Sequence, residues 1–172
     1  LFIMVKKDLH FQIRMKAPLG GKAIPAGYQQ SEQMSMASGI SLFGTNSNSA
    51  TLSDSQVEAY IKRFAKVAIT EQDKFGIPAS IKMAQGIIES QAGQASSTTQ
   101  RNNHFGQPLA QEHFGNAWEN WRAHSIFLTN SSFRRLLTFH NDVEKWAEGL
   151  EALGYSTDKD YAEKLMWIIL AL

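Results

Sequence analysis

Between residues 55 and 172 the large apolar residues recur every three or four positions, the spacing of one face of an α-helix. The first such segment begins near Ser55, whose hydroxyl with Glu58 three residues later is typical of a capping box, and it ends at Gly76. Its apolar positions are Val57, Tyr60, Ile61, Phe64, Val67, Ala68 and Phe75. A second segment follows at once from Pro78 to Ser90, so we expect the two to form a helical hairpin.

Three more segments with helical spacing lie towards the end of the chain. They cover about residues 118–128, 141–153 and 157–172. The middle one is expected to start at Asn141 or Asp142 as its cap and to stop at Gly154. The last one is expected to be capped by Thr157 or Asp158. The pattern therefore predicts a mainly α-helical domain from residue 53 to the end.

The first 52 residues follow a different pattern. Apolar and polar residues alternate over residues 8–15, which predicts a strand with one buried face. Residues 17–52 are rich in Gly, Ser, Ala, Asn and Gln, which predicts a linker. The first 22 residues carry five basic residues and one Asp, a net charge of +4, which leaves −3 for the remainder. We expect a basic N-terminal arm and linker over 1–52, whose residues 1–22 either pack on their own domain or dock on a larger assembly.

Glu89 is the residue whose neighbours in the sequence point to chemistry. It ends a segment whose apolar side chains are Ile81, Met83, Ala84, Ile87 and Ile88. A carboxyl group beside such neighbours is partly desolvated, which raises its pKa towards the range of a general acid. Small residues around it, Ser90 among them, leave space for a ligand. The alternative is that Glu89 only ends a core helix at the surface.

Composition narrows the functional classes. The chain has 172 residues, 43% hydrophobic and 19% charged, which suits one globular domain with an extension. It has no cysteine, which excludes disulfides, a thiolate nucleophile and a Cys-based metal site. A formal charge of +1 gives no overall case for nucleic-acid binding. No run of about 18 apolar residues is present, so we expect no membrane span, and no signal peptide is recognisable.

Four short motifs stand in one order along the helical domain. Residues 76–93 read GIPASIKMAQGIIESQAG, and a polar loop then leads to NNHFG at 102–106. Residues 124–128 read HSIFL, and residues 154–165 read GYSTDKDYAEKL. Together they resemble the glucosaminidase domains of glycoside hydrolase family 73, over about residues 56–170. The resemblance implies a lysozyme-like helical fold and hydrolysis of peptidoglycan glycan strands, with no metal or organic cofactor.

The NNHFG turn offers groups that suit a sugar. Asn102 and Asn103 can fix a turn and still present donors and acceptors to hydroxyl or acetamido groups. Phe105 is expected to be a hydrophobic plug, and Gly106 allows backbone geometry that other residues resist. His104 is either a structural hydrogen-bonding residue or part of the site. We take these residues, with Ser90, as candidate substrate-binding residues.

Two tyrosines of the C-terminal motif are further candidates. The resemblance implies that a tyrosine from this ending faces the cleft, where it orients the acetamido group of the substrate or stabilises an oxazolinium-like intermediate. Tyr155 and Tyr161 both fit, and each is equally well a core residue with a satisfied hydroxyl. The sequence leaves the choice between them open.

The chain departs from the family between the NNHFG turn and the HSIFL helix. The family has a small β-rich lobe there that supplies a second acidic residue, whereas only residues 107–117 fill that place here. The lobe is therefore predicted to be reduced or absent. Glu112 is the only acid in this segment and is our candidate for the second catalytic group, although a solvated surface Glu is the competing interpretation. Glu119 lies just beyond it.

Three functional interpretations follow. The leading one is a peptidoglycan hydrolase of the N-acetylglucosaminidase type in the cell envelope, periplasm or outside the cell, with Glu89 as general acid. The 2-acetamido group of the substrate could serve as nucleophile if no second carboxylate is in place. The alternative is a structural adaptor of a machine that crosses the cell envelope or resembles a phage tail, with a lysozyme-like body. A lytic transglycosylase, with a single Glu and anhydro-sugar products, is the third.

Overall fold

The computed structural model of the protein describes residues 52–106 and 109–172. The predicted N-terminal strand, the linker up to residue 51 and the docking segment lie outside these residues. The elements are α1 (Asp54–Phe75), α2 (Ala79–Ser90), α3 (Ser96–Arg101), α4 (Ala117–Asn130), the 3-10 helix η1 (Ser132–Phe139), α5 (Val143–Ala152) and α6 (Tyr161–Ala171). No strand occurs within the described ranges. The predicted mainly α-helical fold is confirmed.

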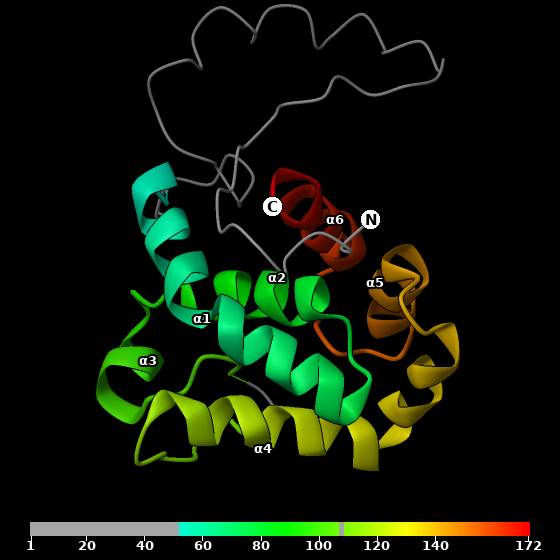
Figure 1. Ribbon diagram of the computed structural model, residues 1–172, viewed down its shortest axis with the longest axis horizontal. Coiled ribbons are helices and arrows are strands. Elements are labelled where there is room, and N and C mark those ends of the chain that lie inside the picture. Colours follow the sequence, from blue (N-terminus) through cyan, green and yellow to red (C-terminus); the bar gives the residue numbers. More distant parts are fainter. Residues whose placement is uncertain (1–51, 107–108) are drawn as a thin grey trace, which may run out of the picture.

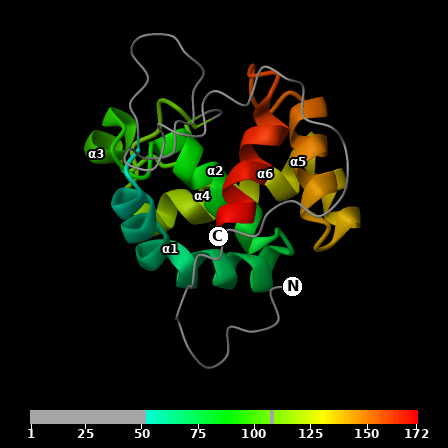
Figure 2. The same ribbon diagram turned by 90° about the horizontal axis from the view of Figure 1, so that it is seen from above.

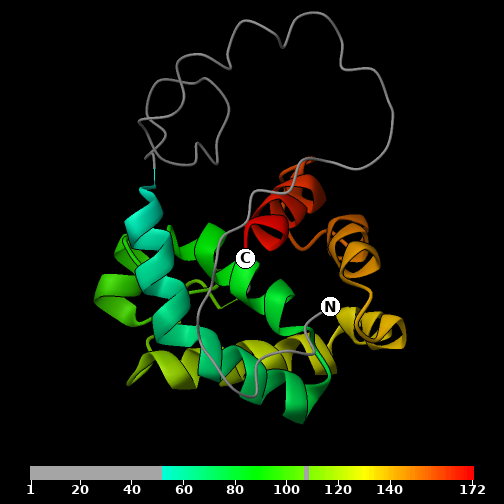
Figure 3. The same ribbon diagram turned by 45° about the horizontal axis from the view of Figure 1, so that its top comes forward.

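Helix α2 runs through the middle of the helical body (Figure 1). It packs against α1 on one side and against α5 and α6 on the other. Figures 2 and 3 show α6 crossing beside α2 and next to α5, with α1 and α4 on the opposite side of α2. The predicted hairpin of the first two helices is present, since α1 and α2 pack together across the short turn after Gly76.

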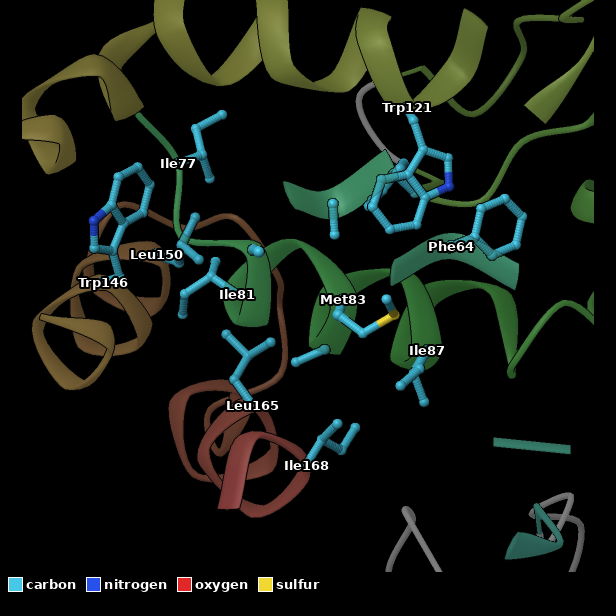
Figure 4. Packing of buried hydrophobic residues seen from close by; sticks show 14 of the residues in the cluster. Phe64, Ile77, Ile81, Met83, Ile87, Trp121, Trp146, Leu150, Leu165 and Ile168 are labelled. Carbon is cyan, nitrogen blue, oxygen red and sulfur yellow. The ribbon is translucent and has the colours of Figure 1, made fainter. Parts of the chain in front are cut away.

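The core forms on both sides of α2. Ile77, Ile81, Ala84 and Ile87 have no exposed surface. Figure 4 shows Ile77 and the α2 residues Ile81 and Ile87 among residues of α5 and α6 on one side and aromatic residues of α1 and α4 on the other. The larger buried partners are Phe64, Trp121, Trp146, Leu150, Leu165 and Ile168. A helix with apolar contacts on both sides is buried along its length, and its last turn is therefore carried into the interior.

The helix ends agree with the prediction only in part. Helix α1 starts earlier than expected, because Ser53 caps it and Gln56 completes the capping box that we expected from Ser55 and Glu58. Both pairs have the same sequence spacing, so the pattern alone cannot separate them. Asp142 caps α5, as expected, by accepting the Lys145 amide. The expected polar loop of residues 94–101 contains helix α3, where the Thr99 hydroxyl bonds back to backbone carbonyls.

The start of α6 is also displaced from the prediction. The helix begins at Tyr161 after Asp160, not after Thr157 or Asp158. Asp158 instead accepts the backbone amide of Asp160 and pairs with Lys164. This turn places Tyr161 at the first position of the helix, and its side chain is buried in the protein.

A buried charged cluster joins α1, α2 and α4. Lys82 of α2 has no exposed surface, and its Nζ donates to the Trp121 carbonyl at 2.8 Å and to Ser125 Oγ at 2.7 Å. Burial lowers the pKa of Lys82 to about 7, although the charge of Glu71 acts in the opposite direction. Glu71 is itself buried and pairs with Arg122 at 2.7 Å. The cluster ties three helices together away from the end of α2.

Leu52, assigned to the linker by the sequence pattern, is only 2% exposed and belongs to the core. Among the described residues no helix is both long enough and apolar enough to span a membrane.

Candidate active site

Glu89 lies in the last turn of α2. The helix ends directly after it, because Gln91 takes the left-handed conformation with a φ of 49°. Glu89 is partly buried, and this burial raises its pKa. The negative charge of Asp158 acts in the same direction, while a hydrogen bond from Tyr161 partly offsets the rise. The carboxyl group therefore keeps its proton to a higher pH than an ordinary Glu does.

Tyr161 is the direct partner of Glu89. Its hydroxyl donates to Glu89 Oε1 over 3.0 Å, across 72 positions of sequence. The ring is 1% exposed, and burial raises the pKa of Tyr161 well above its usual value, so the phenol stays a neutral donor. Gln85, one turn before Glu89 on α2, is fully buried, and neither its Nε2 nor its Oε1 has a hydrogen-bond partner among the described residues.

Tyr155 lies between α5 and α6 and forms the next layer of the site. Its ring stacks on that of Tyr161, with centroids 5.5 Å apart and planes 25° apart. Its hydroxyl is hydrogen-bonded to His124 Nε2 at 2.8 Å. Burial raises the pKa of Tyr155 well above its usual value, and the charge of Glu89 adds to the rise. Of the two candidate tyrosines, Tyr161 contacts Glu89, and Tyr155 packs against the ring of Tyr161.

The NNHFG turn passes the other oxygen of Glu89. Gly106 has a φ of 57°, and a Cβ atom at this position would lie 3.6 Å from Glu89 Oε2. Glycine suits this position for two reasons. It adopts this φ without strain, and it leaves space beside the carboxyl group of Glu89. The two carboxyl oxygens thus have different surroundings, with the Tyr161 hydroxyl at Oε1 and a bare backbone turn at Oε2.

Of the other residues of this turn, Asn102 is partly buried and the next three are buried. Asn103 is fully buried, its Oδ1 accepts the Phe105 and Gly106 amides, and its Nδ2 donates to the Leu109 carbonyl. Asn102 donates to the Phe114 carbonyl at 2.9 Å. The two Asn side chains therefore hold the turn and the short segment that follows it.

His104 and Phe105 are also buried. His104 Nδ1 is hydrogen-bonded to the Tyr60 hydroxyl at 2.9 Å, and burial lowers the pKa of His104 to about 4. The Phe105 ring has no exposed surface and stacks on His124. Phe105 is thus the hydrophobic plug that the sequence predicted. Both residues lie beneath the surface of the turn and do not line it.

Ser90 is fully buried as well, even though it follows Glu89 directly. Its hydroxyl donates to the Gly86 carbonyl and accepts the Gly93 amide at 2.8 Å. Both hydrogen bonds stabilise the end of α2. Ser90 is therefore next to Glu89 in the chain, but its hydroxyl is not presented to solvent.

The structure does not place Glu112 in this group. Its side chain is exposed on the segment between α3 and α4. Glu119 stabilises the start of α4 instead, because its carboxylate accepts the Gly115 amide and the Asn116 side-chain amide. The second carboxylate whose charge acts on Glu89 is Asp158, which is paired with Lys164.

Sequence reasoning missed three contributors to the site. Gln85 precedes Glu89 by four positions, which places both on one helix face, and this spacing is a usable signal. The sequence indicates Asp158 only as a helix cap. His124 belongs to the HSIFL motif, but nothing in the sequence indicates its contact with Tyr155. Within the described ranges no group of His, Asp or Glu is arranged to hold a metal ion.

A helical body with a desolvated carboxyl group at the end of its central helix is the arrangement of a lysozyme-like glycoside hydrolase. The chain belongs to the glucosaminidase family, described as mannosyl-glycoprotein endo-β-N-acetylglucosaminidase, whose family model matches residues 65–172. The family assignment made from the sequence motifs is confirmed. No curated protein matches the chain in sequence.

Solved structures with a similar fold include the following two. One is an N-acetylmuramoyl-L-alanine amidase from Staphylococcus aureus, with a TM-score of 0.60 and 20% identity over 75% of this chain and 47% of that one. The other is a type VI secretion system effector-immunity complex from Pseudomonas protegens, with a TM-score of 0.56 and 18% identity over 69% of this chain and 92% of that one. The chain spans about half the length of the amidase. At these identities the likeness concerns the fold.

Proposed function

We propose that this protein hydrolyses β-1,4 glycosidic bonds of peptidoglycan glycan strands as an N-acetylglucosaminidase, with Glu89 as general acid. The observation that carries the proposal is the asymmetric environment of the Glu89 carboxyl group. Tyr161 donates to Oε1, so the proton of the neutral acid resides on Oε2. Oε2 faces Gly106, where no side chain occupies the space. A glycosidic oxygen at that position would receive the proton.

The reaction proceeds from this proton. Glu89 transfers it to the leaving glycosidic oxygen while the bond from that oxygen to C1 breaks. The carbonyl oxygen of the substrate's own 2-acetamido group bonds to C1 and gives an oxazolinium ion, a route that requires no second carboxylate. Water then attacks C1, its proton returns to Glu89, and the acetamido group is released.

The neighbouring tyrosines support this route. Tyr161 stabilises the carboxylate that forms when Glu89 loses its proton, because its hydroxyl already donates to that group. Tyr155 stands next in the stack and is suited to orient the acetamido group. Asn102, Asn103, His104, Phe105 and Ser90 act in this proposal as the frame of the turn and of the helix end. Glu112 takes no step in it.

The location and partners belong to the same proposal. A hydrolase of glycan strands works in the cell envelope, in the periplasm or outside the cell. Both structural neighbours are consistent with such a setting, since one is named for an N-acetylmuramoyl-L-alanine substrate and the other for a secretion system. Residues 1–22, which carry a net charge of +4, remain our candidate for docking on a larger assembly.

The proposal is tested by digestion of purified peptidoglycan with the protein and with Glu89→Gln. Released fragments are reduced with borohydride and identified by mass spectrometry. Reducing N-acetylglucosamine ends from the wild type and none from the variant are expected. Reducing N-acetylmuramic acid ends would show that the protein cleaves the other glycosidic bond of the strand. Anhydro ends would show that the reaction is that of a transglycosylase. A high-mannose glycoprotein serves as the second substrate, because the family is described by that activity. Release from neither substrate by a folded protein would favour the structural adaptor.

A further inference from the structure

His124 of α4 is a buried histidine that the proposed reaction does not use. It has no exposed surface, and its ring lies flat on Phe105, with centroids 3.9 Å apart and planes 2° apart. Its Nε2 is hydrogen-bonded to Tyr155 at 2.8 Å, whereas its Nδ1 has no hydrogen-bond partner among the described residues. Burial lowers the pKa of His124 well below its usual value, and the charge of Lys82 adds to this. The ring is therefore neutral and carries one N–H.

The unpartnered Nδ1 decides which nitrogen carries that proton. A proton on Nδ1 would leave a buried N–H donor without an acceptor, which costs about 1–3 kcal/mol. A lone pair on Nδ1 costs less, because buried acceptors without partners are tolerated better than buried donors. The proton consequently belongs on Nε2, and His124 is the donor in its hydrogen bond with Tyr155. The Tyr155 oxygen is the acceptor.

This arrangement determines what the Tyr155 hydroxyl can do. Since its oxygen accepts from His124, its own proton is turned away from His124. The Tyr155 ring stacks on Tyr161, and the charge of Glu89 acts on the Tyr155 hydroxyl. The proton is thus free to be donated to a group other than His124.

We infer that His124 is a positioning residue that fixes Tyr155 as a hydrogen-bond donor beside Glu89. The inference rests on the proposed function and assigns the recipient of that hydrogen bond as the carbonyl oxygen of the substrate's 2-acetamido group. A donor held on that oxygen sets its orientation for attack on C1. Phe105 fixes the plane of the His124 ring, so the buried NNHFG plug contributes to the reaction through His124 and Tyr155.

A set of four variants tests the inference. Tyr155→Phe removes the hydroxyl, His124→Phe keeps a stacking ring but removes the donor, and both are combined in the double variant. We expect each single variant to lower kcat by about 10- to 100-fold with little change in KM, the size of one hydrogen bond to a developing charge. The double variant should fall no further than Tyr155→Phe alone. His124→Gln, whose side-chain amide can donate from a similar position, should recover part of the lost kcat.

Multiplying effects in the double variant would overturn the inference, because they would mean that His124 does not act through the Tyr155 hydroxyl. Nitrogen NMR of the histidine ring gives a second and separate measurement. A protonated Nε2 and an unprotonated Nδ1 are expected for His124 in the wild type, and the reverse tautomer would also overturn the inference. This measurement needs no activity and no folded variant. If the wild type proves inactive, the proposed function fails, while the NMR result still decides the hydrogen-bond direction.

Discussion

Helix α2 carries two ionisable side chains that are withdrawn from solvent, and they differ in how their surroundings treat charge. Lys82 is fully buried, and a backbone carbonyl and the Ser125 hydroxyl accept its hydrogen bonds. Glu89 is less deeply buried, and the Tyr161 hydroxyl donates to one of its oxygens while the second faces a bare turn. The deeper group is enclosed by partners, and the shallower one keeps an open side.

This difference teaches that burial and a shifted pKa do not by themselves indicate an active site. Lys82 has a pKa shifted to about 7 and still has no room for a ligand, because protein groups fill its surroundings. Glu89 combines a raised pKa with an unoccupied side at Oε2. The following predictions test this contrast, beginning with the largest expected effect.

Neutral replacements of Glu89 and Lys82 should differ in their effect on turnover. Glu89→Gln should lower turnover by about 10²- to 10⁴-fold, the usual contribution of a general acid, without lowering the melting temperature. Lys82→Met should lower the turnover of the folded protein far less, because Lys82 acts on the site only through Phe105 and His124. Steady-state kinetics and thermal unfolding of both variants measure this. Equal losses of activity would mean that the two buried groups form one functional unit.

Removing the counter-charge of the Lys82 cluster should destabilise the fold strongly. Glu71→Ala leaves Arg122 without its carboxylate and removes the negative charge that acts on Lys82. Because the Arg122 side chain is 37% exposed, the cost should lie below that of a fully buried pair, which is about 3–5 kcal/mol. Urea unfolding gives the free energy. The matched control is Glu58→Ala on the same helix, whose pair with Lys62 is exposed and should cost less than about 1 kcal/mol. Similar losses in the two variants would contradict the role of the cluster.

Stability should increase with pH on the alkaline side because of Lys82. Its pKa is about 7 in the folded protein and 10.5 when unperturbed, so between these values the unfolded chain binds more protons than the folded one. The free energy of unfolding therefore rises with pH in this window, by at most about 1.4 kcal/mol per pH unit. Urea titrations at several pH values measure the slope, and Lys82→Met should remove it. A slope that persists in the variant would assign it to other groups.

Two partners of Glu89 should shift the pH profile in opposite directions. As a general acid Glu89 works when protonated, so kcat/KM falls as pH rises through its pKa. Tyr161→Phe removes a hydrogen bond that lowers this pKa, and the alkaline limb should move to higher pH. Asp158→Asn removes a charge that raises it, and the limb should move to lower pH. Shifts in the same direction would show that another group controls the limb.

Much of the helical body is predictable from local pattern. The apolar spacing of α2 indicates a buried helix that ends at Glu89, and the structure confirms complete burial of Ile81 and Ile87. Local pattern fails where a polar residue is buried through distant partners. The apolar pattern does not include Lys82, because the groups that accept its hydrogen bonds lie 39 and 43 positions away.

The site is predictable only in part, for the same physical reason. Desolvation of Glu89 follows from its own neighbours in α2. The hydrogen bond from Tyr161 spans 72 positions, so the sequence could name both tyrosines but could not choose between them. Asn102 and Asn103 look identical as turn residues and as sugar ligands, and only the structure shows that their amides are used by Phe114 and Leu109.

The short segment between α3 and α4 also bears on where this domain can accept additional residues. Asn102 and Asn103 tie its described part to the end of α3, while Asn120 of α4 accepts the His104 amide and closes the interior without help from that segment. Chain can be added at such a surface loop at small entropic cost. A longer segment at this surface should therefore leave Glu89 and Tyr161 where they are.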